Sequence, residues 1–284
     1  MKLIILTFFF LYYFIGNHVY AQNLDYTKSS DSTETVWSLF KHDAKYTLKG
    51  VGHSVTRPVH WKGDDFAKLG ILFVGTASMS LADNSIRAFS QNNRDDFPKA
   101  IRDFGWYFGN PQNYFMANAG LYGFGLITKN EKIRKTSVLI ISSSITTGFL
   151  QTLTKTVVGR ARPGSGLDHL EFKPFSDKAR YHSFPSGHTV MSITMSHAIA
   201  KQFENTWVKV GIYSIGAIAP ISRLIDDAHW ITDIAFSTVL SIIVVDSIDN
   251  YLFGEKAYDY PKKEKHISWN LRFGANQIGI VGSF

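Results

Sequence analysis

The chain has 284 residues and a formal net charge of +7 at pH 7, because 30 Lys and Arg outnumber 23 Asp and Glu. A hydrophobic content of 45% is ordinary for a packed globular protein, and the absence of cysteine excludes a disulfide framework and a thiolate active site. The excess of positive charge suits anionic partners, such as phosphorylated substrates or an acidic lipid surface. We expect no nucleic-acid partner, because the sequence has no helix-turn-helix, zinc or aromatic-strand pattern.

Residues 1–21 have the pattern of a secretory signal peptide. Lys2 supplies the positive charge, residues 3–15 are apolar, and Ala21 is the small residue before the expected cleavage site. The apolar run is short for a full membrane span, which favours cleavage over retention as an uncleaved anchor. The sequence therefore predicts an exported protein.

Residues 22–65 are expected to form an N-terminal extension ahead of the main domain. Its start is polar, and Ser32 or Thr33 could cap a short, modestly amphipathic helix. Residues 50–63 contain glycines and Pro58, and we expect them to form a loop.

Residues 66–250 are expected to form the main domain, an all-α bundle of about six core helices. The prediction depends on apolar segments that are separated by charged, polar or glycine-rich breaks. The expected helices cover residues 66–82, 114–128, 136–154, 189–200, 208–222 and 231–245. Residues 251–284 are expected to form a tail with β-like character, because apolar and polar residues alternate from Ile267 to Asn276.

Three short clusters within residues 155–233 carry the chemistry, and the last of them contains His229 and Asp233. The segment after Arg223 has no Gly or Pro until beyond Asp246, so we expect a helix that places both side chains on one face. A carboxylate in that position can accept a proton from one imidazole nitrogen and leave the other free as a nucleophile. Taken alone, the pattern also fits an ordinary His–Asp pair on a helix surface.

The second cluster is Pro185, Ser186, Gly187 and His188, directly before an apolar run that is typical of a helix. Ser186 stands at the N-cap position, and the backbone N–H groups of Ser186 and Gly187 would offer an anion site. His188 could donate a proton to a leaving oxygen. Taken alone, the pattern also fits a helix-starting turn with an incidental histidine.

The first cluster places Lys155 and Arg162 seven residues apart, which is about two turns if the helix continues that far. The planar guanidinium matches phosphate oxygens, and the lysine adds a compact charge. Arg160 lies on a different face, and we expect it to be solvated. The alternative is the ordinary basic end of a long apolar helix.

Together, the three clusters resemble the type 2 phosphatidic acid phosphatase superfamily, which includes lipid phosphatases, soluble bacterial acid phosphatases and vanadium haloperoxidases. Every fixed position matches the pattern Lys155-x6-Arg162-Pro163, Pro185-Ser186-Gly187-His188 and Ser222-Arg223-x5-His229-x3-Asp233. The resemblance covers about residues 66–250 of the chain. Two departures stand close to the last histidine, namely Asp226-Asp227 where apolar or small residues are usual, and Ile231 where proline is frequent.

The resemblance implies a role for each motif residue. His229 would be the catalytic nucleophile that forms a phosphohistidine, Asp233 would orient it, and His188 would be the general acid. The groups that would hold the phosphate oxygens are Lys155, Arg162, Ser186, Gly187 and Arg223. Because these cations supply the charge that a divalent ion gives elsewhere, we expect no metal and no cofactor.

The sequence therefore predicts a metal-independent phosphatase that hydrolyses a phosphomonoester or diphosphate, on a lipid or a small phosphoester, through a phosphohistidine. Two other functions stay open. One is a vanadium-dependent haloperoxidase, in which His229 would bind vanadate. The other is a non-catalytic module that binds phosphate or phospholipid. An anionic membrane surface is a further candidate partner, and no pattern indicates the oligomeric state.

The expected location is the periplasm, with the protein soluble or peripherally attached to a membrane. Several expected helices are shorter than the roughly 20 apolar residues that a span needs, and they are rich in Ser, Thr and Gly. An exported N-terminus followed by three spans would bring Lys155 to the cytoplasmic side, whereas the resemblance implies an outward-facing site. The alternative is an integral membrane protein with an outward-facing site and a different number of spans.

Overall fold

The computed structural model describes residues 35–254, 257–258, 268–274 and 277–283. By their contacts the residues form two compact units, a helical unit within Glu34–Lys262 and a second unit that contains the C-terminal strands. The expected signal peptide, residues 1–21, lies outside the described residues.

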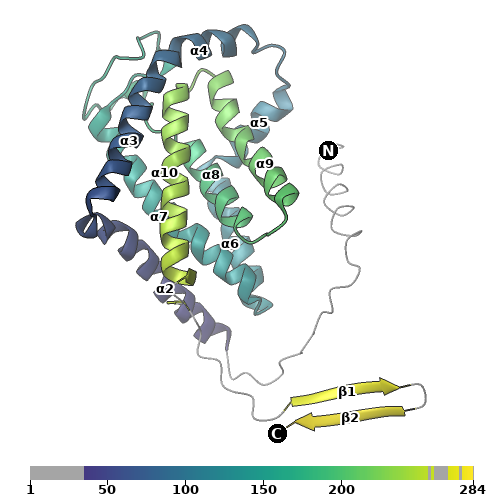
Figure 1. Cartoon of the computed structure of the whole chain (residues 1–284). Coiled ribbons are helices and arrows are strands. Elements are labelled where there is room, and N and C mark those ends of the chain that lie inside the picture. Colours follow the sequence, from purple (N-terminus) through teal and green to yellow (C-terminus); the bar gives the residue numbers. More distant parts are fainter. Residues whose placement is uncertain (1–34, 255–256, 259–267, 275–276, 284) are drawn as a thin grey trace. The chain divides into compact units, whose positions relative to one another are not determined.

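The helical unit confirms the predicted all-α bundle (Figure 1). Short 3-10 turns join some of its helices, and a π-helical turn extends the last one. Its α-helices are α2 (Val36–Thr56), α3 (Gly63–Met79), α4 (Asp83–Asn92), α5 (Lys99–Phe108), α6 (Pro111–Ile127), α7 (Glu131–Val158), α8 (Gly187–Ala200), α9 (Thr206–Ile225) and α10 (Ile231–Asp249).

The longest helix, α7, is also the central one. It packs against α2, α6, α8 and α10, while α8 lies against α9 and α10 as well. Helix α5 packs on α9, and α3 packs on α10 (Figure 1). Because consecutive core helices run in opposite directions, the ends of α7 and α9 and the starts of α8 and α10 meet at one end of the bundle.

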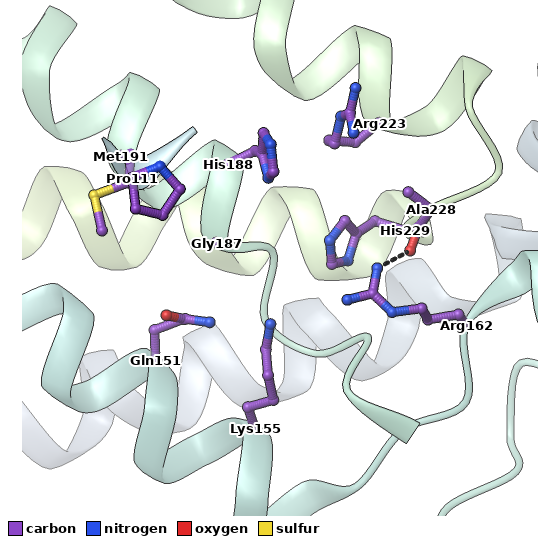
Figure 2. Close-up of a pocket in the computed structure, with 10 residues that line it drawn as sticks. All are labelled: Pro111, Gln151, Lys155, Arg162, Gly187, His188, Met191, Arg223, Ala228 and His229. Atoms are coloured by element: carbon purple, nitrogen blue, oxygen red, sulfur yellow. Dashed lines mark hydrogen bonds between the residues drawn. The ribbon is translucent and has the colours of Figure 1, made fainter. Parts of the chain in front are cut away.

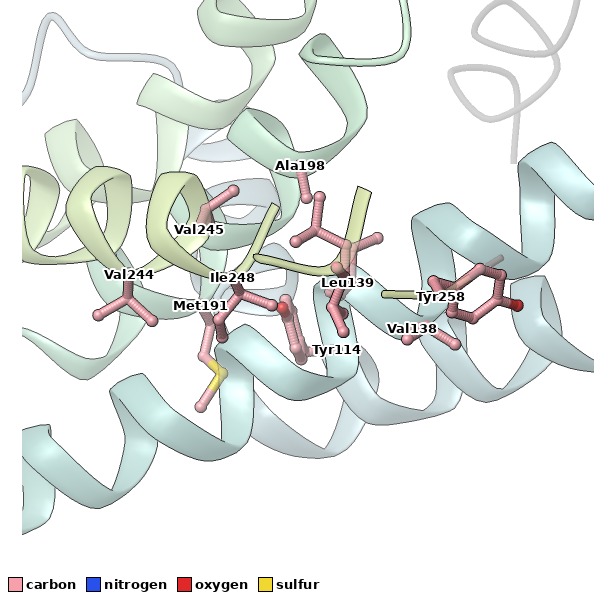
Figure 3. Packing of buried hydrophobic residues seen from close by; sticks show 11 residues of the cluster. Tyr114, Val138, Leu139, Met191, Ala198, Val244, Val245, Ile248 and Tyr258 are labelled. Atoms are coloured by element: carbon pink, nitrogen blue, oxygen red, sulfur yellow. The ribbon is translucent and has the colours of Figure 1, made fainter. Parts of the chain in front are cut away.

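The apolar core lies between α6, α7, α8, α10 and the segment that follows α10 (Figure 3). Ile140 of α7 and Ile248 of α10 are fully buried in it. Its members are Tyr114, Val138, Leu139, Ile140, Met191, Ala198, Val244, Val245, Ile248, Leu252 and Tyr258. This core fixes the central helices against one another, so the helix ends that carry the motifs are held by rigid elements.

Helix α7 also carries buried hydroxyls on its inner side and exposed apolar side chains on its outer side. On α7, Ser142, Thr146 and Thr147 are buried, and each hydroxyl donates a hydrogen bond to the carbonyl one turn earlier. On the outward side of the same helix, Phe149 and Leu153 are 56% and 52% exposed. Hydroxyls satisfied inside and large apolar side chains outside suit a lipid environment.

Four segments of the described chain are long and apolar enough to cross a membrane. They are Gly63–Asn92, Glu131–Val158, Thr206–Ile225 and Ile231–Gly254. The most apolar window of Gly63–Asn92 has none of its residues buried inside the protein. The bundle is therefore membrane-associated, and the integral alternative gains support over a soluble protein.

Two predictions for the N-terminal extension were wrong. The first helix is capped by Thr35, whose hydroxyl accepts from the N–H of Ser38, and not by Ser32 or Thr33. The same helix, α2, continues to Thr56 through the expected loop. A Cβ on Gly50 would lie 3.2 Å from Ile248, so the glycine that suggested a break instead permits close packing on α10.

The second unit contains an antiparallel hairpin of β1 (Ser268–Gly274) and β2 (Gln277–Ser283). The register pairs Ser268 with Ser283 and Gly274 with Gln277. The predicted strand is therefore present as β1. The second strand was missed, because two glycines interrupt its apolar residues and no polar side chain alternates with them.

Candidate active site

A cavity of about 270 Å³ lies at the end of the bundle where the four core helix ends meet (Figure 2). It brings together six of the eight predicted site residues; the other two, Ser186 and Asp233, are buried behind its wall. The lining residues are Pro111, Gln151, Lys155, Arg162, Gly187, His188, Met191, Arg223, Ala228 and His229.

His229 and Asp233 do not share a helix face, so the prediction of a helix through both was wrong. Helix α10 begins at Ile231 with Trp230 as its N-cap, and His229 therefore precedes the helix. Asp233 accepts a hydrogen bond from the N–H of Trp230 at 2.9 Å, and its Oδ2 lies 3.5 Å from Nδ1 of His229. The carboxylate thus caps the helix and faces one ring nitrogen, which leaves Nε2 on the cavity side (Figure 2).

Asp233 is completely buried, and residues outside the motifs satisfy its oxygens. Its Oδ1 accepts from Nη1 of Arg160 at 2.6 Å, and its Oδ2 accepts from the hydroxyl of Ser183 at 2.5 Å. Arg160 is only 3% exposed, so the expectation that it is solvated was wrong. A buried carboxylate needs such partners, because an unpaired charge in this position would cost several kcal/mol.

Arg160 is shared between two buried carboxylates. Its Nη2 donates to Oδ2 of Asp83 at 2.5 Å, and its Nε donates to the carbonyl of His169 at 3.0 Å. Oδ1 of Asp83 accepts from both the N–H and the hydroxyl of Thr232, at 3.1 and 2.7 Å. Asp83 and Asp233 therefore hold the start of α10 from two sides. No sequence pattern points to Asp83, which lies 77 residues from Arg160.

His188 is the second imidazole of the cavity, and it stands in the first turn of α8. The predicted N-cap is confirmed, because the Ser186 hydroxyl accepts from the N–H of Thr189 at 3.5 Å. Nε2 of His188 is buried and has no hydrogen-bond partner in the described part of the chain. The turn between α5 and α6 closes on this ring, since a Cβ on Gly109 would lie 2.8 Å from the Cβ of His188.

Both imidazoles are neutral at pH 7, because the pKa of each ring is lowered. Burial, together with repulsion from Arg223, lowers the pKa of His188 to about 3. Burial also lowers the pKa of His229 to about 4, although Asp233 favours the charged ring. Two neutral rings among three cations leave the cavity with a strong positive potential, which suits a phosphate group.

The cations come from three different segments. Lys155 lies in the last turn of α7, but the helix ends at Val158 and Gly159 adopts a left-handed conformation with φ of 59°. The spacing had suggested that Lys155 and Arg162 could lie on one helix. They do not, because the helix ends between them. The Arg162 guanidinium donates to three backbone carbonyls, those of Ala179, His182 and Ala228, at 3.0–3.1 Å.

One of the two expected backbone anion donors is used elsewhere. The N–H of Ser186 donates to the hydroxyl of Ser237 at 2.8 Å, so it does not point into the cavity. Gly187 does line the cavity. A Cβ on Gly187 would lie 3.4 Å from the side chain of Gln151, which lines the cavity one turn before Lys155 on α7. Gln151 was missed, because it lies outside the three motifs.

Residues 136–248 match the PAP2 superfamily, and this match contains the three motifs. This segment belongs to the PAP2 superfamily. A lipid A 1-phosphatase of Rhizobium etli is 30% identical over 97 residues, which are 34% of this chain and 41% of the relative. A lipid A 1-phosphatase of Porphyromonas gingivalis is 24% identical over 131 residues, which are 45% of this chain and 26% of the relative.

The crystal structure of Aquifex aeolicus LpxE has a TM-score of 0.43 and 17% identity, covering 60% of this chain and 95% of that one. This chain spans less than half the length of either lipid A 1-phosphatase that it matches.

The acidic pair that departs from the usual PAP2 pattern binds arginines. Asp227 accepts two hydrogen bonds of 2.8 Å from Arg87 of α4. Asp226 accepts from Arg223 at 2.7 Å and lies 3.6 Å from Arg102 of α5. The pair therefore ties the turn before His229 to two helices that lie outside the matched segment.

Proposed function

We propose that this protein is a membrane-bound phosphatase that removes phosphate from a phosphorylated lipid, as a phosphomonoester or diphosphate, through a phosphohistidine and without a metal ion. The main support is the single cavity in which two imidazoles and three cations converge from segments far apart in the sequence. The names of the two relatives support a phosphorylated lipid as the substrate class.

In the first step, Nε2 of His229 attacks phosphorus, and the bond between phosphorus and the leaving oxygen breaks as the P–N bond forms. His188 donates its proton to that leaving oxygen. The dianionic phosphate favours a charged ring and so raises the pKa of His188 when substrate binds. The ring then takes up this proton from solvent. Lys155, Arg162 and Arg223 stabilise the charge on the phosphoryl oxygens.

In the second step, water attacks the phosphohistidine. The neutral ring of His188 accepts a proton from this water, the P–N bond breaks, and its electron pair returns to His229. Inorganic phosphate then leaves with its charge balanced by the same cations. Asp233 keeps Nδ1 of His229 protonated in both steps, which leaves Nε2 as the reacting atom.

We further propose that the cavity faces away from the cytoplasm, as the resemblance implies. Helix α3 runs from the end of the bundle where α2 lies to the end that carries the cavity (Figure 1). An outward cavity therefore places α2 on the cytoplasmic side if the bundle crosses the membrane. This orientation is incompatible with a leader that exports the chain directly before α2.

The test is phosphate release by His229→Ala in a detergent-solubilised or reconstituted protein. We expect a loss of at least about 10³-fold in kcat, with acid-labile labelling of the wild type and none of the variant. His60→Ala, an exposed histidine outside the cavity, serves as the matched control. Activity should survive excess chelator, and halide oxidation with added vanadate is measured in parallel. Substantial turnover by a folded His229→Ala protein would reject the proposal.

A further inference from the structure

A second, apolar cavity of about 410 Å³ lies between α5, α6 and α8. Two of its polar groups are engaged, since the Tyr114 hydroxyl bonds to Ser144 and the Asn113 amide donates to the carbonyl of Tyr107. We call this cavity the α5–α8 groove. Its lining residues are Phe104, Tyr107, Phe108, Asn113, Tyr114, Ala117 and Met195. A wall that consists mostly of aromatic and aliphatic carbon suits a hydrocarbon chain.

The groove continues the phosphate cavity along the same two helices. Pro111 and Met191 line the phosphate cavity, while Tyr114 and Met195 line the groove. Each pair is separated by about one helical turn, which advances about 5.4 Å along the axis. The groove therefore begins directly beyond the Pro111–Met191 side of the phosphate cavity.

The chemistry of phosphoryl transfer directs the leaving group toward that side. The nucleophile and the leaving oxygen stand roughly in line on opposite sides of phosphorus. Figure 2 shows His229 and Arg162 on one side of the cavity, with Gln151, Pro111 and Met191 on the other. A phosphate attacked by His229 therefore points its ester oxygen, and whatever alcohol it carries, toward Gln151 and the groove.

The groove also opens to an exposed apolar surface. On its outer rim, Phe104 and Tyr107 are 41% and 59% exposed. A molecule that lies in the membrane could therefore enter with its chain in the groove while its phosphate reaches the cations. Gln151, which lies on the same side of the phosphate cavity as Pro111 and Met191, offers an amide to polar atoms next to the phosphoester (Figure 2).

We propose that the α5–α8 groove binds a hydrocarbon chain on the alcohol side of the substrate, so that the enzyme prefers phosphate esters of long-chain alcohols. This inference rests on the proposed phosphatase function. Burial in the groove favours longer chains by up to about fourfold in kcat/KM per added methylene, which is the transfer free energy of one CH₂ group converted to a ratio.

The first test compares n-alkyl phosphates of increasing length, all below their micelle concentrations, with p-nitrophenyl phosphate. We expect kcat/KM of the wild type to rise with each methylene. Ala117→Trp and Met195→Trp, which fill the groove, should flatten this rise and leave p-nitrophenyl phosphate within about twofold of wild type. Met116→Trp is the matched control on α6, because Met116 is 66% exposed and lines neither cavity. A chain-length profile that is flat in the wild type, or unchanged in both filled variants, would overturn the proposal.

The second test needs no turnover and so separates the groove from the proposed function. A long-chain alkyl phosphate that carries a diazirine in mid-chain should label residues 104–117 and Met195, and inorganic phosphate should reduce this labelling. If the groove is labelled but no phosphate is released, the groove stands and the phosphatase function fails. If phosphate is released but the label spreads over the outer faces of α3 and α9, the chain stays in the bilayer and the groove proposal fails.

Discussion

Asp233 is held by residues that lie outside the three motifs. Arg160 donates to it and to Asp83, and all three residues are at most 3% exposed. Two carboxylates and one guanidinium leave a net negative charge next to His229. This charge favours the positive ring that forms when His229 carries the phosphoryl group. We infer that Asp83 is a positioning residue for the nucleophile.

Asp83→Asn should lower kcat by about 10–100-fold with a small change in KM, because a hydrogen bond between charged groups is worth about 1.5–3 kcal/mol. Steady-state kinetics of phosphate release checks this, and Asp177→Asn, an exposed carboxylate in the loop before α8, is the matched control. Thermal unfolding is measured on the same samples. A lower melting temperature with an unchanged kcat in the folded fraction would assign Asp83 a purely structural role.

The two lowered histidine pKa values lead to a prediction about anion binding. The pKa of His188 is about 3 in the empty cavity, and a bound dianion raises it. Between the free and bound pKa values, binding takes up a proton, so affinity must increase as pH falls. Sulfate is the chosen probe, because its charge does not change over this range. Its Kd should fall by up to about tenfold per pH unit below the bound pKa.

Calorimetry in two buffers of different ionisation enthalpy measures this proton uptake directly. His188→Gln should abolish most of the uptake and flatten the dependence of Kd on pH. A Kd that stays constant from pH 8 to pH 5 in the wild type, or uptake that persists in His188→Gln, would contradict the assignment of the proton to His188.

The motif residues could be predicted from sequence because each cluster is local. Residue order does not reveal partners that meet only after folding, such as Asp83 and Arg160, which are 77 positions apart. Arg160 was misassigned for a physical reason. Helical geometry was extended past Val158, whereas Gly159 turns the chain and directs Arg160 into the interior.

At the scale of single elements, the start of α8 was predicted because a serine marks it. Ser186 caps α8 as expected. The expected helix over residues 231–245 begins where α10 begins, but the separate expectation that the helix also includes His229 was wrong, because Trp230 is the N-cap. At this helix start the capping group is the Asp233 carboxylate, which stands at the third helical position and accepts a hydrogen bond from the N–H of Trp230. The same carboxylate that caps the start of α10 also faces His229.

The contact between α5 and α9 depends on a glycine and gives a test of element packing. A Cβ on Gly105 would lie 2.5 Å from Oγ of Ser222 and 2.8 Å from the carbonyl of Ile218. Gly105→Ala should therefore push α5 away from α9 and destabilise the protein by roughly 1–3 kcal/mol. Because Arg102 and Gly109 lie on or next to α5, phosphate release should fall as well.

Gly120→Ala is the matched control, because nothing lies within 4 Å of a Cβ at that position of α6. Alanine favours a helix over glycine, so this variant should be neutral or more stable by up to about 1 kcal/mol. The measurement is the thermal unfolding of both variants, which compares their stabilities with that of the wild type. Equal stability of the two would mean that α5 and α9 are not in the close contact described.

At the scale of the whole molecule, the all-α bundle was predictable but its membrane character was not. Buried hydroxyls on α7, α8 and α10 make the sequence less apolar than a membrane protein usually is. Many of these hydroxyls donate to a carbonyl of their own helix or of a neighbouring helix, as Ser192 does to the carbonyl of Gly216. Average polarity could not reveal that the apolar side chains face outward, because that depends on which face of each helix packs inside.

The bundle geometry makes a specific prediction about topology. The loop between α7 and α8 lies at the cavity end, and the turn between α8 and α9 lies at the opposite end (Figure 1). The chain has no cysteine, so single cysteines can be introduced without a background signal. Asp177→Cys probes the first loop and Glu204→Cys probes the second turn, and both side chains are exposed.

If the bundle crosses the membrane, a membrane-impermeant maleimide should label only one of the two cysteines in intact cells and both after lysis. Labelling of Asp177→Cys alone is the expected result, because the proposed cavity faces outward. Labelling of Glu204→Cys alone would mean that the bundle crosses the membrane but that the cavity faces the cytoplasm. That result would agree with an exported leader before α2. Equal labelling of both in intact cells would mean that the helices do not cross. Some other apolar surface would then have to cover the exposed apolar faces of α3 and α9. Cross-linking through the same cysteines would test whether a second copy of the chain provides it.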